Sequence, residues 1–228
     1  MPAEWARHEA TWLAWPHHAD DWPGKLSAIH WVYGEIVRRL APGERVRILA
    51  PPGRVRNKAM SVLRRTGVDM DRVEWFDIPT NRSWARDTGP IFVTRDASPR
   101  LAVTDFHFNA WAKYPNWEHD DAVARLAAEH LGVPRYVIER DGRQVVLEGG
   151  AVEINGAGTI ITTEECLADQ QTQVRNPGFT MQNTEQVLRE ALGATQVIWL
   201  GRGIAGDDTH GHIDDLCRFV REDTIVLC

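Results

Sequence analysis

Residues 199–220 read WLGRGIAGDDTHGHIDDLCRFV, two short apolar runs joined by a loop of glycine, aspartate and histidine. Apolar runs of this length favour strands, whereas glycine and aspartate favour turns. The stretch therefore predicts one strand, a polar loop, and a second strand that begins at His212. Because binding and catalytic side chains are commonly placed on loops at strand ends, this segment is the first candidate for a functional site.

The same alternation of short strands with helices continues outward through the chain. Ser27 and Thr180 are the expected N-caps of two helices, and Gly193 is expected to end the second of them. Apolar periodicity predicts helices at residues 27–40, 57–66, 120–131 and 180–192. Short apolar runs predict strands at residues 10–15, 45–50, 73–78, 91–94, 102–106, 145–147, 151–155, 159–162, 196–200, 212–220 and 224–228.

This alternation indicates an α/β fold. No linker or low-complexity stretch interrupts it, so we expect a single domain over residues 1–228. The last predicted strand, TIVLC at residues 224–228, reaches the final residue without a turn after it. Natural domains rarely finish in mid-strand, and we therefore expect this domain to be incomplete at its C-terminus.

Charge and cysteine content restrict the classes of function. The net charge of -6 at pH 7 argues against a nucleic-acid or anionic membrane partner and favours a small cationic ligand. No apolar run approaches the roughly 20 residues that a bilayer crossing needs, and the N-terminus lacks the basic and apolar parts of a secretion signal. Cys166, Cys217 and Cys228 form no C-x-x-C pair, which favours the reducing cytoplasm.

Four polar clusters lie at predicted strand ends or in glycine-rich loops. They are residues 81–90 (NRSWARDTGP), 108–114 (FNAWAKY), 148–150 (EGG) and 201–215 (GRGIAGDDTHGHIDD). Asp87 in the first cluster is equally compatible with a turn before Thr-Gly-Pro, and Glu148 in the third with a bulge between strands. The residues alone therefore leave structural roles open for both carboxylates.

The cluster at 201–215 admits two interpretations besides guanidinium chemistry. Its glycines satisfy the G-x-G-x-x-G dinucleotide fingerprint, but that motif must open a helix, and the residues that follow lack helical periodicity. His210, His212 and Asp214 nearly match the H-x-H-x-D-H signature of metallo-β-lactamase-like hydrolases, with Asp215 in place of the last histidine. Two imidazoles and a carboxylate suit a transition metal, so a metal-dependent hydrolase is an alternative.

A third interpretation of this cluster is guanidinium chemistry. In an alternating strand, His212 and Asp214 would share one face about 6–7 Å apart. A guanidinium presents planar N–H donors that carboxylates bind bidentately. Its resonance-stabilised carbon requires a strong nucleophile, and its departing amine requires an acid. Carboxylates would bind the guanidinium, and an imidazole beside them would supply the acid.

Five blocks of the sequence are distinctive, at residues 2–16, 81–93, 108–114, 147–167 and 199–220. These blocks resemble agmatine deiminases, which are close relatives of bacterial peptidyl-arginine deiminases. The similarity extends from residue 2 to residue 228. The resemblance implies a pentein-type α/β propeller, a fan of five ββαβ modules around a pseudo-fivefold axis with the site at its centre. This chain would contain about three of the five modules.

The resemblance also implies roles for individual residues. Asp87 and Asp214 match the two carboxylates that bind the guanidinium. His212 matches the general acid and base, and Glu148 matches the carboxylate that holds this histidine in the site. Trp84, in the loop of Asp87, is expected to form a wall beside the substrate.

The reaction implied by the resemblance is hydrolysis of agmatine to N-carbamoylputrescine and ammonia, in putrescine biosynthesis. A cysteine thiolate attacks, ammonia leaves an amidino intermediate, and water releases the product without a metal or organic cofactor. A homo-oligomer is implied, and a peptidyl-arginine substrate is the alternative within the family. The family's nucleophilic cysteine has no counterpart here, so we nominate none of Cys166, Cys217 and Cys228 and expect the chain alone to be inactive.

Overall fold

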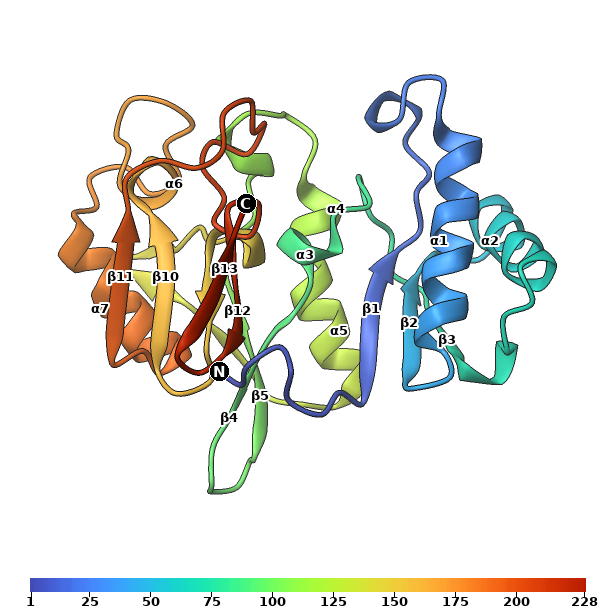
Figure 1. Ribbon diagram of the computed structural model, residues 1–228, viewed down its shortest axis with the longest axis horizontal. Coiled ribbons are helices and arrows are strands. Elements are labelled where there is room, and N and C mark those ends of the chain that lie inside the picture. The colour runs from blue at the N-terminus through green and yellow to red at the C-terminus, as the bar shows by residue number, and fades with distance from the viewer. The chain divides into compact units, whose positions relative to one another are not determined.

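The computed structural model describes all 228 residues, and they form two compact units (Figure 1). The first unit comprises Met1–Ala6, Arg86–Trp117 and Ala124–Cys228. The second unit comprises Arg7–Ala85 and Glu118–Val123. Each unit is described by itself.

The second unit contains a parallel three-stranded sheet in the order β1-β2-β3. Two helices connect these strands, and residues of the helices and strands share one buried hydrophobic cluster that includes Val37, Ile48 and Leu63. Figure 1 shows both helices beside this sheet. The elements are β1 (Ala10–Ala14), α1 (Leu26–Leu40), β2 (Arg45–Leu49), α2 (Arg54–Arg65) and β3 (Val73–Phe76).

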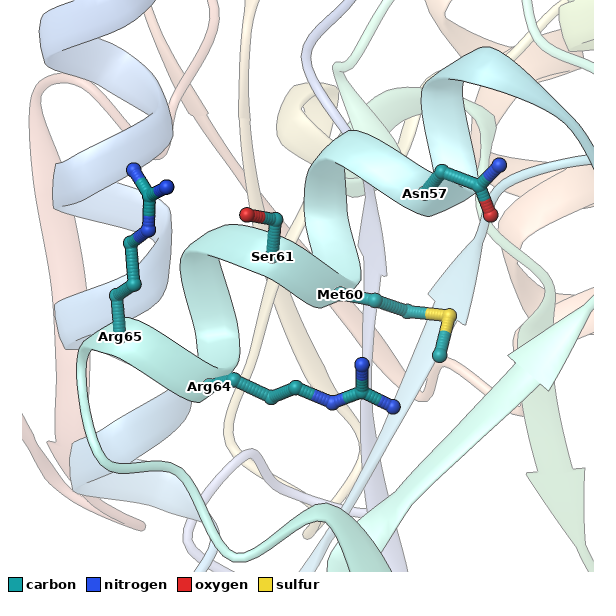
Figure 2. A pocket seen from close by; sticks show the side chains of 5 residues that line it. All are labelled: Asn57, Met60, Ser61, Arg64 and Arg65. Atoms are coloured by element: carbon teal, nitrogen blue, oxygen red, sulfur yellow. The ribbon is translucent and has the colours of Figure 1, made fainter.

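An open hollow of about 410 Å³ lies on α2. Figure 2 shows that its lining side chains all come from this one helix; they are Asn57, Met60, Ser61, Arg64 and Arg65. The lining contains two guanidinium groups and no carboxylate. Because like charges repel, this hollow is not a site for a cationic ligand.

The first unit contains two segments in which strands and a helix are connected in the same way. Strand β4 pairs antiparallel with β5, and α5 then leads to β6, which pairs parallel with β5. In the same way β9 pairs antiparallel with β10, and α7 leads to β11, which pairs parallel with β10. Both segments are ββαβ units. Their elements are β4 (Ile91–Thr94), β5 (Leu101–Asp105), α5 (Val123–Leu131), β6 (Arg135–Val137), β9 (Glu153–Ile154), β10 (Thr159–Thr163), α7 (Met181–Leu192) and β11 (Gln196–Leu200).

The remaining elements are short and connect these segments. The hairpin of β12 (Cys217–Arg221) and β13 (Thr224–Leu227) follows the second ββαβ unit. The others are η1 (Ala19–Asp21), η2 (Met70–Arg72), α3 (Ala85–Thr88), η3 (Ala110–Ala112), α4 (Glu118–Asp121), β7 (Glu139–Arg140), β8 (Arg143–Gln144), η4 (Gly149–Ala151) and α6 (Glu164–Leu167). No helix in the structure combines the length and the apolar character that crossing a membrane requires.

The ends of α7 confirm the predicted caps. The Thr180 side chain accepts a hydrogen bond from the backbone N–H of Asn183, whose own side chain bonds back to Thr180. Gly193 follows the helix with a left-handed φ of 76°, the conformation that glycine adopts without a steric cost.

Other local predictions were wrong. Helix α1 begins at Leu26 after Lys25, which makes no side-chain cap, so Ser27 lies inside the helix. The helix expected at residues 120–131 is divided into α4 and α5. The strand expected at 145–147 makes only an isolated bridge, between His107 and Val146.

The strand expected to begin at His212 begins instead at Cys217. The cause is the side chain of Asp207. Its Oδ2 accepts hydrogen bonds from the backbone N–H groups of Gly211, at 2.8 Å, and of His212, at 2.9 Å. A backbone N–H that is bonded to a local carboxylate is not available for a strand ladder, so this segment forms a loop.

Candidate active site

Four predicted site residues converge within the first unit. The His212 Nδ1 atom lies 3.7 Å from Asp87 Oδ1 and 3.8 Å from Asp214 Oδ1. On the other edge of the ring, Nε2 lies 3.6 Å from Glu148 Oε2. These side chains come from α3, from the residue before η4 and from the loop between β11 and β12. Only 3% of the His212 side chain is exposed, and three carboxylates surround it.

The loop of His212 is held in place from several sides. The backbone N–H groups of Gly211 and His212 donate to Asp207, and the Gly211 carbonyl accepts a 2.5 Å hydrogen bond from Thr163 Oγ1 at the end of β10. The Thr209 carbonyl accepts a 2.5 Å bond from Arg175 Nη2. The position of the imidazole is therefore determined by tertiary contacts, because the loop has no regular secondary structure of its own.

Asp87 is a nearly buried carboxylate with two fixed donors. Its side chain is 8% exposed. Oδ2 accepts a 3.0 Å bond from the Trp111 indole N–H, and Oδ1 accepts a 3.1 Å bond from the Gly150 backbone N–H. Burial raises the pKa of Asp87 to about 6, because taking the carboxylate out of water disfavours its charged form.

Trp111 is a site residue to which sequence reasoning assigned no role. Residues 110–112 adopt consecutive left-handed backbone angles, with φ of 51°, 59° and 50°. This conformation is costly for residues other than glycine and is often retained at functional sites. The Trp111 ring is 5% exposed and packs edge-on against Phe108 at 5.2 Å. The polar cluster at residues 108–114 was recognised in the sequence as a candidate for a site. No pattern within it indicated a hydrogen bond from Trp111 to Asp87.

Arg175 is a second site residue that the sequence did not indicate. Its side chain and that of Glu148 are both 0% exposed. Arg175 Nε donates a 2.9 Å hydrogen bond to Glu148 Oε1, and Nη1 donates to the Gln173 carbonyl at 2.9 Å. Together with the bond to the Thr209 carbonyl, the guanidinium links the Glu148 segment to the loop of His212.

The charges of Glu148 and His212 depend on these neighbours. Burial raises the pKa of Glu148, but Arg175 and His212 outweigh it and bring the net pKa below its ordinary value. Burial lowers the pKa of His212, but Glu148, Asp87 and Asp214 outweigh it and bring the net pKa above its ordinary value. Buried Glu148 is therefore ionised near neutral pH, and the imidazole is able to hold a proton there.

Asp214 already faces a guanidinium of the protein itself. Arg86 Nε lies 3.4 Å from Asp214 Oδ2, and the same guanidinium pairs with Glu4 and lies 3.6 Å from Glu153. The Asp214 backbone N–H donates to the Gly150 carbonyl at 3.3 Å. The carboxylate at this position thus accepts a planar cation, while Oδ1 remains directed toward His212.

Gly150 lies where no side chain fits. A Cβ atom at this position would lie 2.5 Å from His212 Nδ1 and 2.7 Å from Asp87 Oδ1, both well inside van der Waals contact. The absence of a side chain therefore allows the imidazole and the carboxylate to approach the backbone. This close approach, and not a bulge between strands, explains the glycine after Glu148-Gly149.

The whole chain, residues 1–228, matches the Porphyromonas-type peptidyl-arginine deiminase family. The chain belongs to this family. It is 36% identical over 232 residues to the agmatine deiminase of Stutzerimonas stutzeri, with 100% of this chain and 59% of the relative covered. It is 35% identical over 240 residues to that of Medicago truncatula, with coverages of 100% and 60%. The chain therefore spans about 60% of the length of these relatives.

Solved structures of family members are similar in fold. A Campylobacter jejuni C315S agmatine deiminase with substrate bound matches with a TM-score of 0.82 and 31% identity, covering 99% of this chain and 63% of that one. An Enterococcus faecalis agmatine deiminase matches with a TM-score of 0.85 and 30% identity, with coverages of 100% and 60%. The mixed α/β architecture predicted from the sequence is thus that of the deiminase family, over part of its length.

Trp84 belongs to the second unit, whereas the four converging residues belong to the first. Its side chain is 39% exposed, and its ring lies 5.3 Å from that of Trp22. The predicted role of Trp84 as a wall beside the substrate of this deiminase-family chain stays a prediction.

Two of the three thiols of this deiminase-family chain, those of Cys166 and Cys217, are poorly suited to nucleophilic attack because they are buried. Burial raises the pKa of Cys166 well above its ordinary value, and burial also raises the pKa of Cys217. Cys217 is enclosed by Ile161, Ile213 and other apolar residues. Cys228 is exposed, and its Sγ donates to the Asp215 carbonyl at 3.3 Å. A nucleophilic cysteine needs an accessible thiolate with a lowered pKa.

The alternative metal site of His210, His212 and Asp214 does not assemble. His210 Nε2 is bonded to Asp169 Oδ2 at 2.8 Å and does not join the other two residues. Three potential ligand atoms do lie within 4.8 Å of one another, but they belong to Glu148, Cys166 and His212. The three residues of this alternative therefore do not come together as one ligand set.

Replacing Arg175 by methionine would leave the Glu148 carboxylate buried without its cation. We expect Arg175→Met to lower the free energy of unfolding by about 3–5 kcal/mol, as measured by urea denaturation. Adding Glu148→Gln to this variant should restore part of the loss, because the uncompensated charge is removed. Arg125, an exposed arginine paired with Glu129, is the matched control, and Arg125→Met should cost less than about 1 kcal/mol. Equal losses in the two single variants would contradict this account.

Proposed function

We propose that this chain provides the guanidinium-binding and proton-transfer groups of an agmatine deiminase, acting in cytoplasmic putrescine synthesis. The observation that carries the proposal is the arrangement of three carboxylates around one buried imidazole, with Asp87 and Asp214 at Nδ1 and Glu148 at Nε2. The similar C. jejuni protein is an agmatine deiminase whose structure contains bound substrate, which supports the same ligand here.

Binding of the substrate follows from charge and geometry. A guanidinium offers in-plane N–H donors, and two carboxylates from separate segments accept them in charge-assisted hydrogen bonds. Asp87 and Asp214 are suited to this role because each directs one oxygen toward the edge of His212. Arg86 at Asp214 balances part of the negative charge while the site is empty of substrate. A planar cation is the ligand that this arrangement of charges favours.

The chemical steps use His212 as the proton carrier. A thiolate attacks the guanidinium carbon, and His212 gives its proton to the nitrogen that departs as ammonia, leaving an amidino thioether. Water then adds to this carbon and His212 accepts one of its protons. The C–S bond breaks, the thiolate leaves, and the second proton of the water passes to solvent as the carbonyl group of N-carbamoylputrescine forms. Glu148, ionised beside Arg175, stabilises the imidazole whenever it carries a proton. The thiolate is not supplied by the three cysteines of this chain.

The pentein-type propeller is part of the same proposal. Two successive ββαβ segments in the first unit, and the similarity to agmatine deiminases over the whole chain, support a fold built from such modules. We infer about three modules of five, organised as a single deiminase domain that assembles as a homo-oligomer.

Peptidyl arginine is the alternative substrate, because the family is described as peptidyl-arginine deiminases. A polypeptide that extends this chain to the length of its relatives distinguishes the two. It should release ammonia from agmatine much faster than from free arginine or an arginine-containing peptide. Faster release of ammonia from the peptide would contradict the agmatine assignment and indicate a peptidyl-arginine deiminase.

Agmatine binding tests the roles of the two aspartates directly. In isothermal titration calorimetry the 228-residue chain should bind agmatine more tightly than putrescine, which lacks the guanidinium. Asp87→Asn and Asp214→Asn should each weaken agmatine binding roughly tenfold or more, because a charge-assisted hydrogen bond is lost. Asp96, exposed in the loop between β4 and β5, is the matched control, and Asp96→Asn should leave the affinity unchanged. Similar affinities for agmatine and putrescine would refute the assignment.

The affinity should also depend on pH. The pKa of Asp87 is raised to about 6, so the carboxylate gains a proton and loses its charge as the pH falls through that value. Agmatine binding should therefore weaken below pH 6 by up to about tenfold per pH unit. Titrations between pH 5 and pH 8 should give a shallower dependence for Asp87→Asn, in which this proton no longer matters. An unchanged profile in the variant would assign the dependence to another group.

The 228-residue chain should release no ammonia from agmatine in a coupled assay. The reason is that Cys166 and Cys217 are buried thiols whose pKa values are raised. Ammonia release that disappears in Cys166→Ser would show that this thiol is the nucleophile after all.

A further inference from the structure

Three buried side chains that can bind a metal, two of them from the proposed active site, lie close together. Glu148, Cys166 and His212 each offer one ligand atom, and these atoms all lie within 4.8 Å of one another. Cys166 lies in α6, where its backbone N–H is bonded to Thr163 Oγ1 at 3.0 Å. The three residues are 0%, 2% and 2% exposed, so bulk water does not fill the space between them.

Two of these three ligand atoms have no hydrogen-bond partner. Glu148 Oε2 and His212 Nε2 are both buried and unpartnered. Their separation of 3.6 Å exceeds a hydrogen bond. It is close to the roughly 3.4 Å that separates a nitrogen and an oxygen bound to one tetrahedral zinc, for bonds of about 2.1 Å. Unpaired buried polar atoms are unfavourable, and a shared cation would satisfy both of them.

The opposite edges of both side chains are already anchored. Arg175 holds Glu148 Oε1, and the carboxylates of Asp87 and Asp214 lie behind His212 Nδ1. Carboxylates behind the second nitrogen of a ligating histidine orient its ring and increase its basicity. Such partners fix the positions of Glu148 Oε2 and His212 Nε2, and a ligand atom of each residue lies within 4.8 Å of the Cys166 sulfur.

We propose that Glu148, Cys166 and His212 form a binding site for zinc and similar divalent transition metals. Sulfur, imidazole nitrogen and carboxylate oxygen together are the donor set that zinc accepts. The negative charges of Asp87, Glu148 and Asp214 offset the cost of placing a dication in a buried site. On binding, the Cys166 thiol releases its proton to solvent and coordinates as thiolate. The site lies beyond the proposed function, which uses no metal.

A metal in this site would coordinate His212 Nε2, and the imidazole could then no longer carry the proton that the proposed reaction requires. Zinc and the proton therefore compete for His212, and the metal acts as an inhibitor. The deiminase proposal and this site can be tested separately, because metal binding is observed without agmatine and without turnover.

Cobalt(II) is the probe, because a tetrahedral site with a thiolate ligand gives intense visible bands and an ultraviolet sulfur-to-cobalt charge-transfer band. Every version of the chain used in this experiment carries Cys228→Ser, which removes the exposed thiol. We expect both spectral features with one equivalent of cobalt, and their loss when zinc is added in equal amount. Cys166→Ser should abolish the charge-transfer band and weaken zinc binding roughly 100-fold or more, since even loss of a second-shell partner costs about 10–100-fold.

Cys217→Ser is the matched control, because this buried thiol is enclosed by apolar side chains and has no such partners. It should retain the full cobalt spectrum. His212→Gln is a second test variant and should lose the tetrahedral visible bands, with far-UV circular dichroism used to verify that each variant is folded. Absence of a charge-transfer band, or a band that Cys166→Ser leaves unchanged, would overturn the proposal.

Discussion

The buried ion pair between Glu148 and Arg175 is the interaction on which the rest of the site depends. A carboxylate fully removed from water is stable only with a cation and hydrogen bonds to compensate for lost hydration. Arg175 provides both, and its remaining donors hold the Gln173 and Thr209 carbonyls. One guanidinium thus places an ionised carboxylate beside His212 and fixes the loop that carries the imidazole.

The concentration of negative charge around His212 follows from this arrangement and explains what the site attracts. Asp87, Glu148 and Asp214 all lie within 4 Å of the imidazole, with Arg86 and Arg175 as the nearest cations. Such a field favours a proton on the imidazole and a planar cation at the two aspartates. It equally favours a divalent metal where Cys166 adds a sulfur ligand. Substrate, proton and metal are therefore alternative ways of neutralising the same group of carboxylates.

Local sequence patterns correctly predicted features that are stabilised by interactions between residues close together in the chain. The capping box of Thr180 and the left-handed Gly193 involve residues within a few positions of each other, and most strands were located to within two residues of their observed bounds. The same reasoning failed at His212, although the competing acceptor, the side chain of Asp207, is only five residues away. The alternation of apolar residues carries no information on a hydrogen bond from the backbone to a side chain. The alternating-strand argument placed His212 and Asp214 together for a wrong reason: a loop, and not a strand face, brings them to 3.8 Å.

The sequence by itself determined the family and the α/β class, because blocks of consecutive residues preserve that information. It also predicted that one histidine and three carboxylates form the site. Only the tertiary structure revealed the partners of these groups. Trp111 is 24 residues from Asp87, Arg175 is 27 residues from Glu148, and Gly150 is 63 residues from Asp87. No periodicity or motif spans such distances, since these contacts arise when separate segments are packed together and their buried polar atoms must be satisfied. The proximity of Cys166 to His212 has the same origin.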